Sequence, residues 1–144
     1  MQFRYKSVSS PEGKSIRRPS IPITFIGPSE SIDAIALIDS GADISLIPKE
    51  MAEVLGLDTA GEFKWAYGVG GKVRTVERHL RLKIGRDHET YTLDLPVKVI
   101  IDGYDLSPLL GRKGFFEHFE ITFSEAQEKI WLKHAAPRVK SRKS

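Results

Sequence analysis

Residues 36–48 read ALIDSGADISLIP, and this stretch carries the strongest structural signal in the chain. An apolar run leads into Asp39, and Ser40 and Gly41 follow it. A carboxylate beside buried apolar residues is costly unless it is hydrogen-bonded, paired or protonated. The serine hydroxyl can bond the loop backbone and the glycine permits a tight turn, so the loop can present Asp39 to a cleft. Asp39 is therefore a candidate catalytic residue, although an ordinary turn at a strand end also fits this tripeptide.

The length and composition indicate one globular domain. The chain has 144 residues, of which 40% are hydrophobic and 28% charged, enough for a single core. It has no cysteine, which excludes disulfides and thiolate metal sites, and its four histidines lack metal-ligand spacing. We therefore expect neither a metal nor a cofactor. The N-terminus has no apolar run of signal-peptide length and no stretch approaches a membrane span, so a cytoplasmic protein without membrane contact is expected.

The charges divide the chain into three parts. Residues 1–20 carry five Lys and Arg against one acid, and residues 133–144 carry five and no acid. Residues 21–132 hold 12 basic and 18 acidic residues. The basic ends could hold nucleic acid, but they lack the interleaved aromatic residues that stack on bases. We expect a basic, partly disordered segment over 1–20, a folded domain over 21–133 and a basic tail over 134–144, with nucleic acid an unlikely partner.

The hydrophobic pattern predicts a mainly β fold with one or two short helices. Short apolar or alternating runs are separated by turn residues about every ten positions, which is typical of a small β-barrel or sandwich. Pro48 followed by KEMAEVLG predicts one short helix, and RKGFFEHF predicts another. The expected strands cover residues 21–26, 32–38, 44–47, 62–67, 72–84, 91–101, 120–124 and 128–132.

Two further segments carry candidate functional residues. Gly68-Val69-Gly70-Gly71 lies at the tip of a predicted hairpin, where glycines allow close approach to a ligand and the mobility of a lid. Taken by itself, this segment fits a plain glycine-rich hairpin better. Residues 106–116, LSPLLGRKGFF, run from an apolar stretch into Gly111 and Arg112.

Together the three segments resemble the retropepsin-like, or retroviral-type, aspartic proteases. The family pattern is an apolar pair before Asp-(Ser/Thr)-Gly-Ala, a glycine-rich flap, and an apolar pair before Gly-Arg and a helix. Here these read LIDSGA over 37–42, GVGG over 68–71 and LLGR over 109–112. The order and spacing agree over about residues 20–133. The resemblance implies a small closed β-barrel of the retropepsin-like acid protease type and an aspartic endopeptidase activity without a cofactor.

The resemblance also implies roles for single residues. Asp39 corresponds to the catalytic carboxylate, and Ser40 to the residue whose hydroxyl bonds across to the partner subunit's loop. Gly41, followed by Ala42, corresponds to the residue whose carbonyl accepts a substrate N–H. Asp43 and Arg112 correspond to an ion pair that fixes this loop. Gly68, Val69, Gly70 and Gly71 correspond to the substrate-binding flap, with the Val69 N–H reaching substrate.

One Asp-Ser-Gly per chain implies a second chain. The reaction needs two carboxylates around one water, and 144 residues are too few for a two-lobed form. Asp102-Gly103 also follows an apolar run, but it lacks the hydroxyl residue and reads as a common turn, so we reject it as the second site. We expect a C2 homodimer acting on extended peptides or unfolded protein. The final hairpin near residues 130–132 is the predicted part of the interface.

Two alternatives remain at this point. A non-catalytic module could keep the barrel and grip a peptide or a protein partner. A nucleic-acid-associated protein could act through the basic ends, and its binding would depend steeply on salt. The intact Asp39 loop and the glycine-rich hairpin favour the protease, because neither is needed for binding alone.

Overall fold

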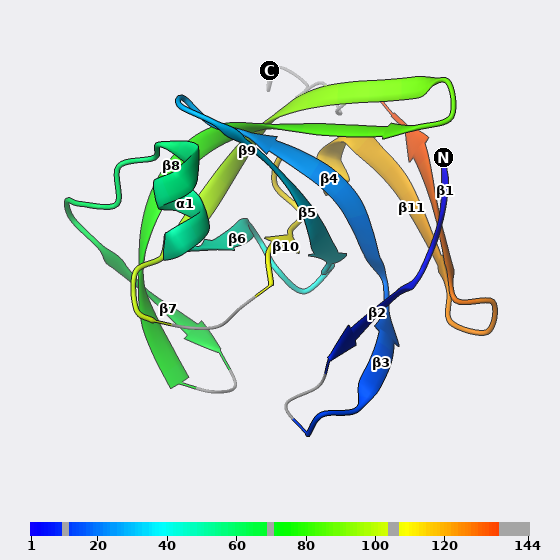
Figure 1. The fold of residues 1–144 in the computed structure, drawn as a ribbon, viewed down its shortest axis with the longest axis horizontal. Coiled ribbons are helices and arrows are strands. Elements are labelled where there is room, and N and C mark those ends of the chain that lie inside the picture. Colours follow the sequence, from blue (N-terminus) through cyan, green and yellow to red (C-terminus); the bar gives the residue numbers. More distant parts are fainter. Residues whose placement is uncertain (10–11, 69–70, 104–106, 136–144) are drawn as a thin grey trace, which may run out of the picture.

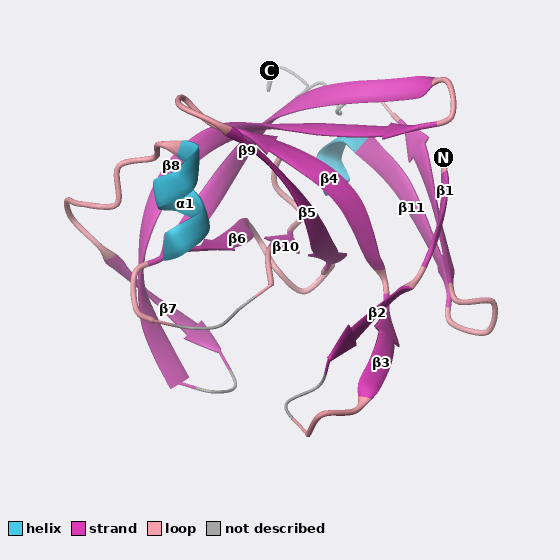
Figure 2. Cartoon of the chain, in the orientation of Figure 1, coloured by secondary structure: helices cyan, strands magenta, loops and turns pink. Residues whose placement is uncertain are grey.

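The structure is a computed structural model that describes residues 1–9, 12–68, 71–103 and 107–135. It is mainly β, with one short α-helix and one turn of 3-10 helix (Figures 1 and 2). The elements are, in chain order, β1 (Gln2–Arg4), β2 (Lys6–Ser9), β3 (Ser15–Arg18), β4 (Ser20–Ile26), β5 (Ser31–Ile38), β6 (Ser45–Pro48), α1 (Lys49–Leu55), β7 (Lys64–Gly68), β8 (Gly71–Arg86), β9 (Glu89–Ile100), β10 (Leu109–Leu110), η1 (Phe116–His118), β11 (Phe119–Ser124) and β12 (Lys129–His134).

The main sheet closes on itself. Its strand order is β4-β5-β10-β6-β9-β8-β7, and β4 also pairs with β8. Six strands therefore form a closed ring, and β7 lies outside the ring and pairs with β8 (Figure 1). Closure removes the free strand edges that an open sheet would expose. The prediction of a mainly β, closed barrel is therefore confirmed.

The barrel interior is filled by the alternating residues that the sequence predicted. Strands β8 and β9 pair antiparallel over a long stretch, from Thr75 opposite Ile100 to Arg86 opposite Glu89. Every second side chain of this pair faces inward, as period-two alternation requires. The buried set includes Leu80, Leu82, Ile84, Leu93, Leu95, Val97 and Val99.

The two predicted helices differ in outcome. Helix α1 follows Pro48 and ends at Gly56, which takes a left-handed conformation with φ 87°, as predicted for residues 49–56. The second helix, predicted over 112–119, is only the 3-10 turn Phe116–His118. Gly114 has φ 84°, a left-handed conformation that a right-handed helix cannot contain, and a Cβ there would lie 2.6 Å from the Pro96 Cδ atom. The predicted helix is therefore interrupted at this residue.

Much of residues 1–20, predicted from their charge to be partly disordered, forms strands within the described part of the chain. Strand β1 pairs with β12, and Phe3 and Tyr5 are buried in the core. The five basic residues obscured an alternation in which these aromatic side chains point inward. Strands β2 and β3 form a hairpin of their own. The C-terminal tail lies outside the described residues from position 136 onward.

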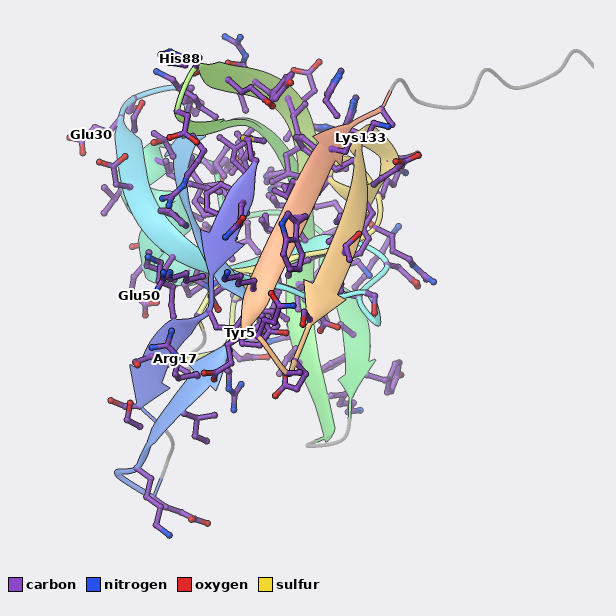
Figure 3. All side chains as sticks on the ribbon, turned by 90° about the vertical axis from the view of Figure 1, so that its right-hand side faces the viewer. Tyr5, Arg17, Glu30, Glu50, His88 and Lys133 are labelled. Carbon is purple, nitrogen blue, oxygen red and sulfur yellow. The ribbon has the colours of Figure 1, made fainter. Side chains whose placement is uncertain are left out.

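A second, three-stranded sheet covers one side of the barrel, with the order β1-β12-β11 (Figure 3). Because β12 is its central strand, both edges of β12 are paired within the chain. Ile130 and Leu132 are buried. The strand edges near residues 130–132, the predicted part of the interface, are therefore paired within the chain, whereas Trp131 is half-buried. No helix among the described residues is long and apolar enough to cross a membrane.

Candidate active site

Asp39 directly follows the buried end of β5. Ile38 is 3% exposed, whereas Asp39 is half-buried and Ser40 is exposed. The Gly41 N–H donates to the Asp39 Oδ1 atom over 2.9 Å, and the Ala42 N–H donates to the Asp39 carbonyl over 3.2 Å. The loop thus orients the carboxylate with its own backbone.

The Asp39 loop is joined to residues 110–113 by the main chain. The Asp39 N–H donates to the Leu110 carbonyl over 3.0 Å, the Arg112 N–H to the Ala42 carbonyl over 2.9 Å, and the Lys113 N–H to the Asp43 carbonyl over 2.9 Å. These bonds give a physical reason for the distant Leu-Leu-Gly-Arg segment, which holds the Asp39 loop in place.

Gly111 lies where the two segments approach most closely. Its N–H donates over 3.0 Å to the hydroxyl of Ser45, which is fully buried. A Cβ at Gly111 would lie 2.6 Å from the carbonyl carbon of Ile44, so only glycine fits. Sequence reasoning missed Ser45, although a serine inside the apolar run ISLI at 44–47 was a signal that could have identified it.

Arg112 forms the expected ion pair with Asp43. The side chains are 58% and 82% exposed, so water screens the attraction, and such exposed pairs contribute about 0.2–1 kcal/mol. The main-chain bonds to Ala42 and Asp43 do not depend on this pair. We infer that the backbone holds the loop and that the ion pair adds a smaller contribution.

The β7–β8 ribbon extends from the barrel as the predicted glycine-rich hairpin (Figure 1). Gly68 and Gly71 lie opposite each other at its end, and Gly71 has φ 114°, which favours glycine. Val69 and Gly70, predicted to form the flap tip, lie outside the described residues. Strand β8 pairs with β9 only as far as Thr75, so toward the tip it pairs with β7 alone.

The two faces of this ribbon differ in chemistry. One face carries Ala66 and Val73, which are opposite each other and half-buried. The other carries Phe63, Trp65 and Tyr67, which are 44%, 44% and 79% exposed. Trp65 therefore does not pack in the barrel interior, where an aromatic side chain of this size would be expected. Strand alternation carried this side chain to the outer face.

The base of the ribbon is fastened to the barrel by Asp102. Its carboxylate accepts the Arg74 backbone N–H over 2.7 Å, and the Arg74 Nε and Nη2 atoms over 2.9 and 2.7 Å. The Ile101 N–H donates to the Arg74 carbonyl over 3.0 Å. Arg74 also lies over the Phe63 ring, with 5.5 Å between guanidinium and ring centroid. Sequence analysis rejected Asp102 as a second catalytic aspartate. Its carboxylate instead binds Arg74 at the point where the ribbon leaves the barrel.

Asp102→Ala should loosen the ribbon without unfolding the barrel. Hydrogen exchange of the Arg74 amide should accelerate by roughly tenfold or more, because a charge-assisted hydrogen bond is lost. Asp94→Ala, which removes an exposed acid opposite Arg81, is the matched control and should leave that amide unchanged. Equal exchange rates in both variants would contradict the fastening role.

The pH dependence of this contact follows from its charge. The hydrogen bonds from Arg74 lower the pKa of the Asp102 carboxyl below its ordinary value. A lowered pKa in the folded state stabilises the fold above the ordinary aspartate range, and this contribution is lost as the pH falls through the lowered pKa. Relative to the intrinsic exchange rate at each pH, the accelerated exchange of Asp102→Ala should therefore appear in the wild type only at a pH below the ordinary range for aspartate.

A surface hollow of about 590 Å³ lies away from this site. It is bordered by β4, β5 and β8, and neither Asp39 nor the β7–β8 ribbon lines it. Within the described residues no group of three or more histidine or acidic side chains is placed to hold a metal ion. Of the other two segments that the sequence identified, residues 109–113 contact the Asp39 loop through main-chain hydrogen bonds.

The closed barrel and the Asp39 loop, which is joined to residues 110–113, are typical of aspartic proteases. Comparison with known proteins supports this class. A crystal structure of a retropepsin-like aspartic protease from Rickettsia conorii is similar, with a TM-score of 0.57 and 20% identity over 94% of this chain and 92% of that chain. At this identity the likeness shows the fold. The sequence model of the aspartyl protease family matches residues 23–113, well over half of the chain. The chain belongs to the aspartyl protease family. No curated protein matches it.

Proposed function

We propose that the chain is an endopeptidase that hydrolyses peptide bonds with a water molecule held between the Asp39 carboxylates of two copies. The observation that carries the proposal is the half-buried Asp39 carboxylate, which follows a buried strand and is oriented by the backbone of its own loop. Family membership supports the protease class, and the single Asp-Ser-Gly supports two copies per site.

The chemistry requires unequal carboxylates. One must be ionised to take a proton from the attacking water, and the other must be protonated to polarise the carbonyl of the peptide. Two carboxylates around one water cannot both ionise easily, because like charges repel at short distance, and aspartic proteases are the standard example. Two identical Asp39 side chains can share one proton in this way, so symmetry is no obstacle to the mechanism.

The β7–β8 ribbon supports an extended peptide as the substrate class. Its half-buried face carries the small side chains Ala66 and Val73 near a glycine-flanked end. Small residues let a substrate main chain approach closely enough for hydrogen bonds to the ribbon backbone. An unfolded segment fits such a site better than a folded surface, since its backbone groups are unpaired.

The test is cleavage of a denatured protein across pH 3 to 7, with new N-termini identified by mass spectrometry. Asp39→Asn is purified in parallel to detect a contaminating protease. Activity per chain should rise with protein concentration, because the proposed site forms from two copies. Cleavage that persists in Asp39→Asn would overturn the proposal. Binding of peptides without any cleavage would favour the alternative of a non-catalytic module.

A further inference from the structure

The β2–β3 hairpin extends from the barrel as a two-stranded sheet (Figures 1 and 3). All four residues of β3 are exposed. An isolated two-stranded hairpin is marginally stable in water, because it has no third strand and no apolar face packed against a core. This segment is therefore a candidate surface for a partner.

One face of the hairpin is fastened within the chain. The Arg17 Nη2 atom donates to the Tyr5 carbonyl over 2.9 Å, and Arg17 pairs with Glu128 over 3.4 Å, which fastens the base to the β11–β12 turn. Figure 3 shows Arg17 and Tyr5 at this base. The fastening is intramolecular, so it fixes the direction in which the rest of the hairpin extends.

The opposite face has the composition of a contact surface. On this face Val8, which is half-buried, is opposite Ile16, which is 40% exposed, and the half-buried Lys6 is opposite Arg18. Alternation along the strands places these four side chains on the face opposite Arg17. Two like charges directly across a strand pair destabilise it, and none of the carboxylates among the described residues pairs with either cation. An acidic partner would remove this repulsion while covering the aliphatic pair.

The base of the hairpin is adjacent to the Asp39 loop. The Ile38 N–H donates to the Pro19 carbonyl over 2.9 Å, and Ser20 lies opposite Leu37. If two Asp39 side chains share one water, the two-fold axis passes close to this point. In Figures 1 and 3 the hairpin and the β7–β8 ribbon extend beyond the same edge of the barrel. A hairpin that leaves the barrel here lies beside the second copy.

We propose that the β2–β3 hairpin is a dimerisation arm whose Lys6, Val8, Ile16 and Arg18 face packs against an acidic surface of a second copy. The charges are complementary, since residues 1–20 carry five basic residues and one acid, while residues 21–132 carry 12 basic and 18 acidic residues. The inference rests on the proposed function, because the position of the two-fold axis follows from an active site that two copies share. It replaces the predicted β12 interface, whose strand edges are already paired.

The arm is tested with Ile16→Asp, and with Arg18→Glu as a second exposed substitution. Sedimentation equilibrium should show a dimer Kd raised by roughly tenfold or more in both. Val54→Asp, an exposed aliphatic position on α1 at 49%, is the matched control and should leave Kd unchanged. Cleavage by the arm variants should recover when the protein concentration exceeds the raised Kd, which a loss of folding would not allow.

The outcomes separate the arm from the shared site. A dimeric, active wild type whose Kd is unchanged by both Ile16→Asp and Arg18→Glu would overturn the arm and leave the proposed function standing. A wild type that cleaves as a monomer would overturn the shared site and the arm together. A raised Kd in Phe123→Asp, on β11, with no change in Ile16→Asp would assign the interface to the three-stranded sheet and overturn the arm.

Discussion

Asp39→Asn is expected to reduce peptide cleavage by roughly 10²- to 10⁴-fold, because asparagine can neither take a proton from water nor give one to the substrate. The amide keeps the size of the carboxylate, and its oxygen can still accept the Gly41 N–H. The fold and the melting temperature should therefore change little. Most of this loss should appear in kcat, the rate of cleavage at saturating substrate.

Mixing the variant with the wild type tests whether two chains share the site. With a tenfold excess of Asp39→Asn and free exchange of subunits, nearly every wild-type chain is in a mixed dimer. Cleavage per wild-type chain should then fall to about a tenth, since a mixed site has one functional carboxylate. An equal excess of Asp33→Asn, an exposed acid on β5, is the control. Undiminished wild-type cleavage in the first mixture would contradict a site built from two chains.

The barrel could be predicted from local pattern because its signals are local. Alternation in β8 and β9, and the proline and glycine at the ends of α1, depend on near neighbours in the sequence. The helix predicted over 112–119 failed because Gly114 takes a left-handed conformation, with φ 84°, where its backbone lies close to Pro96. A contact between segments this far apart in the sequence leaves no periodic trace.

Sequence analysis identified the short motifs of the candidate site but not the residues that hold those motifs in place. Asp39, Gly111 and Arg112 stand in recognisable short motifs, whereas Ser45, Pro19 and Asp102 act through hydrogen bonds to distant backbone groups. Charge was misleading at the N-terminus, where Phe3 and Tyr5 alternate among basic residues yet are buried in the core. Net charge reports on solvation and partners, not on whether a strand forms.

Gly111→Ala is expected to cause the largest loss of stability of any single methyl addition beside the site. The new Cβ would lie 2.6 Å from the carbonyl carbon of Ile44 and 2.8 Å from the carbonyl oxygens of Ala42 and Ile44. All three are backbone atoms, so no side-chain rotation relieves the overlap. Overpacking of this kind lowers the free energy of unfolding by roughly 1–3 kcal/mol, and by more where the backbone cannot shift.

The same substitution should also reduce cleavage more than the stability loss explains. Relief of the overlap requires the Asp39 loop to move away from residues 110–113, which breaks the main-chain bonds that orient the carboxylate. At a temperature where the variant is fully folded, the residual defect should appear in the rate at saturating substrate. Chemical denaturation gives the stability, and peptide cleavage gives the rate.

Gly103→Ala is the matched control for this effect, because a Cβ added there would meet no atom within 4 Å beyond its chain neighbours. It should change the free energy of unfolding by about 0.5 kcal/mol or less. Arg112→Gln removes the ion pair but keeps the main-chain bonds, so its loss should be smaller than that of Gly111→Ala. If Arg112→Gln were the more damaging of the two, the exposed ion pair and not the close backbone approach would hold the Asp39 loop in place.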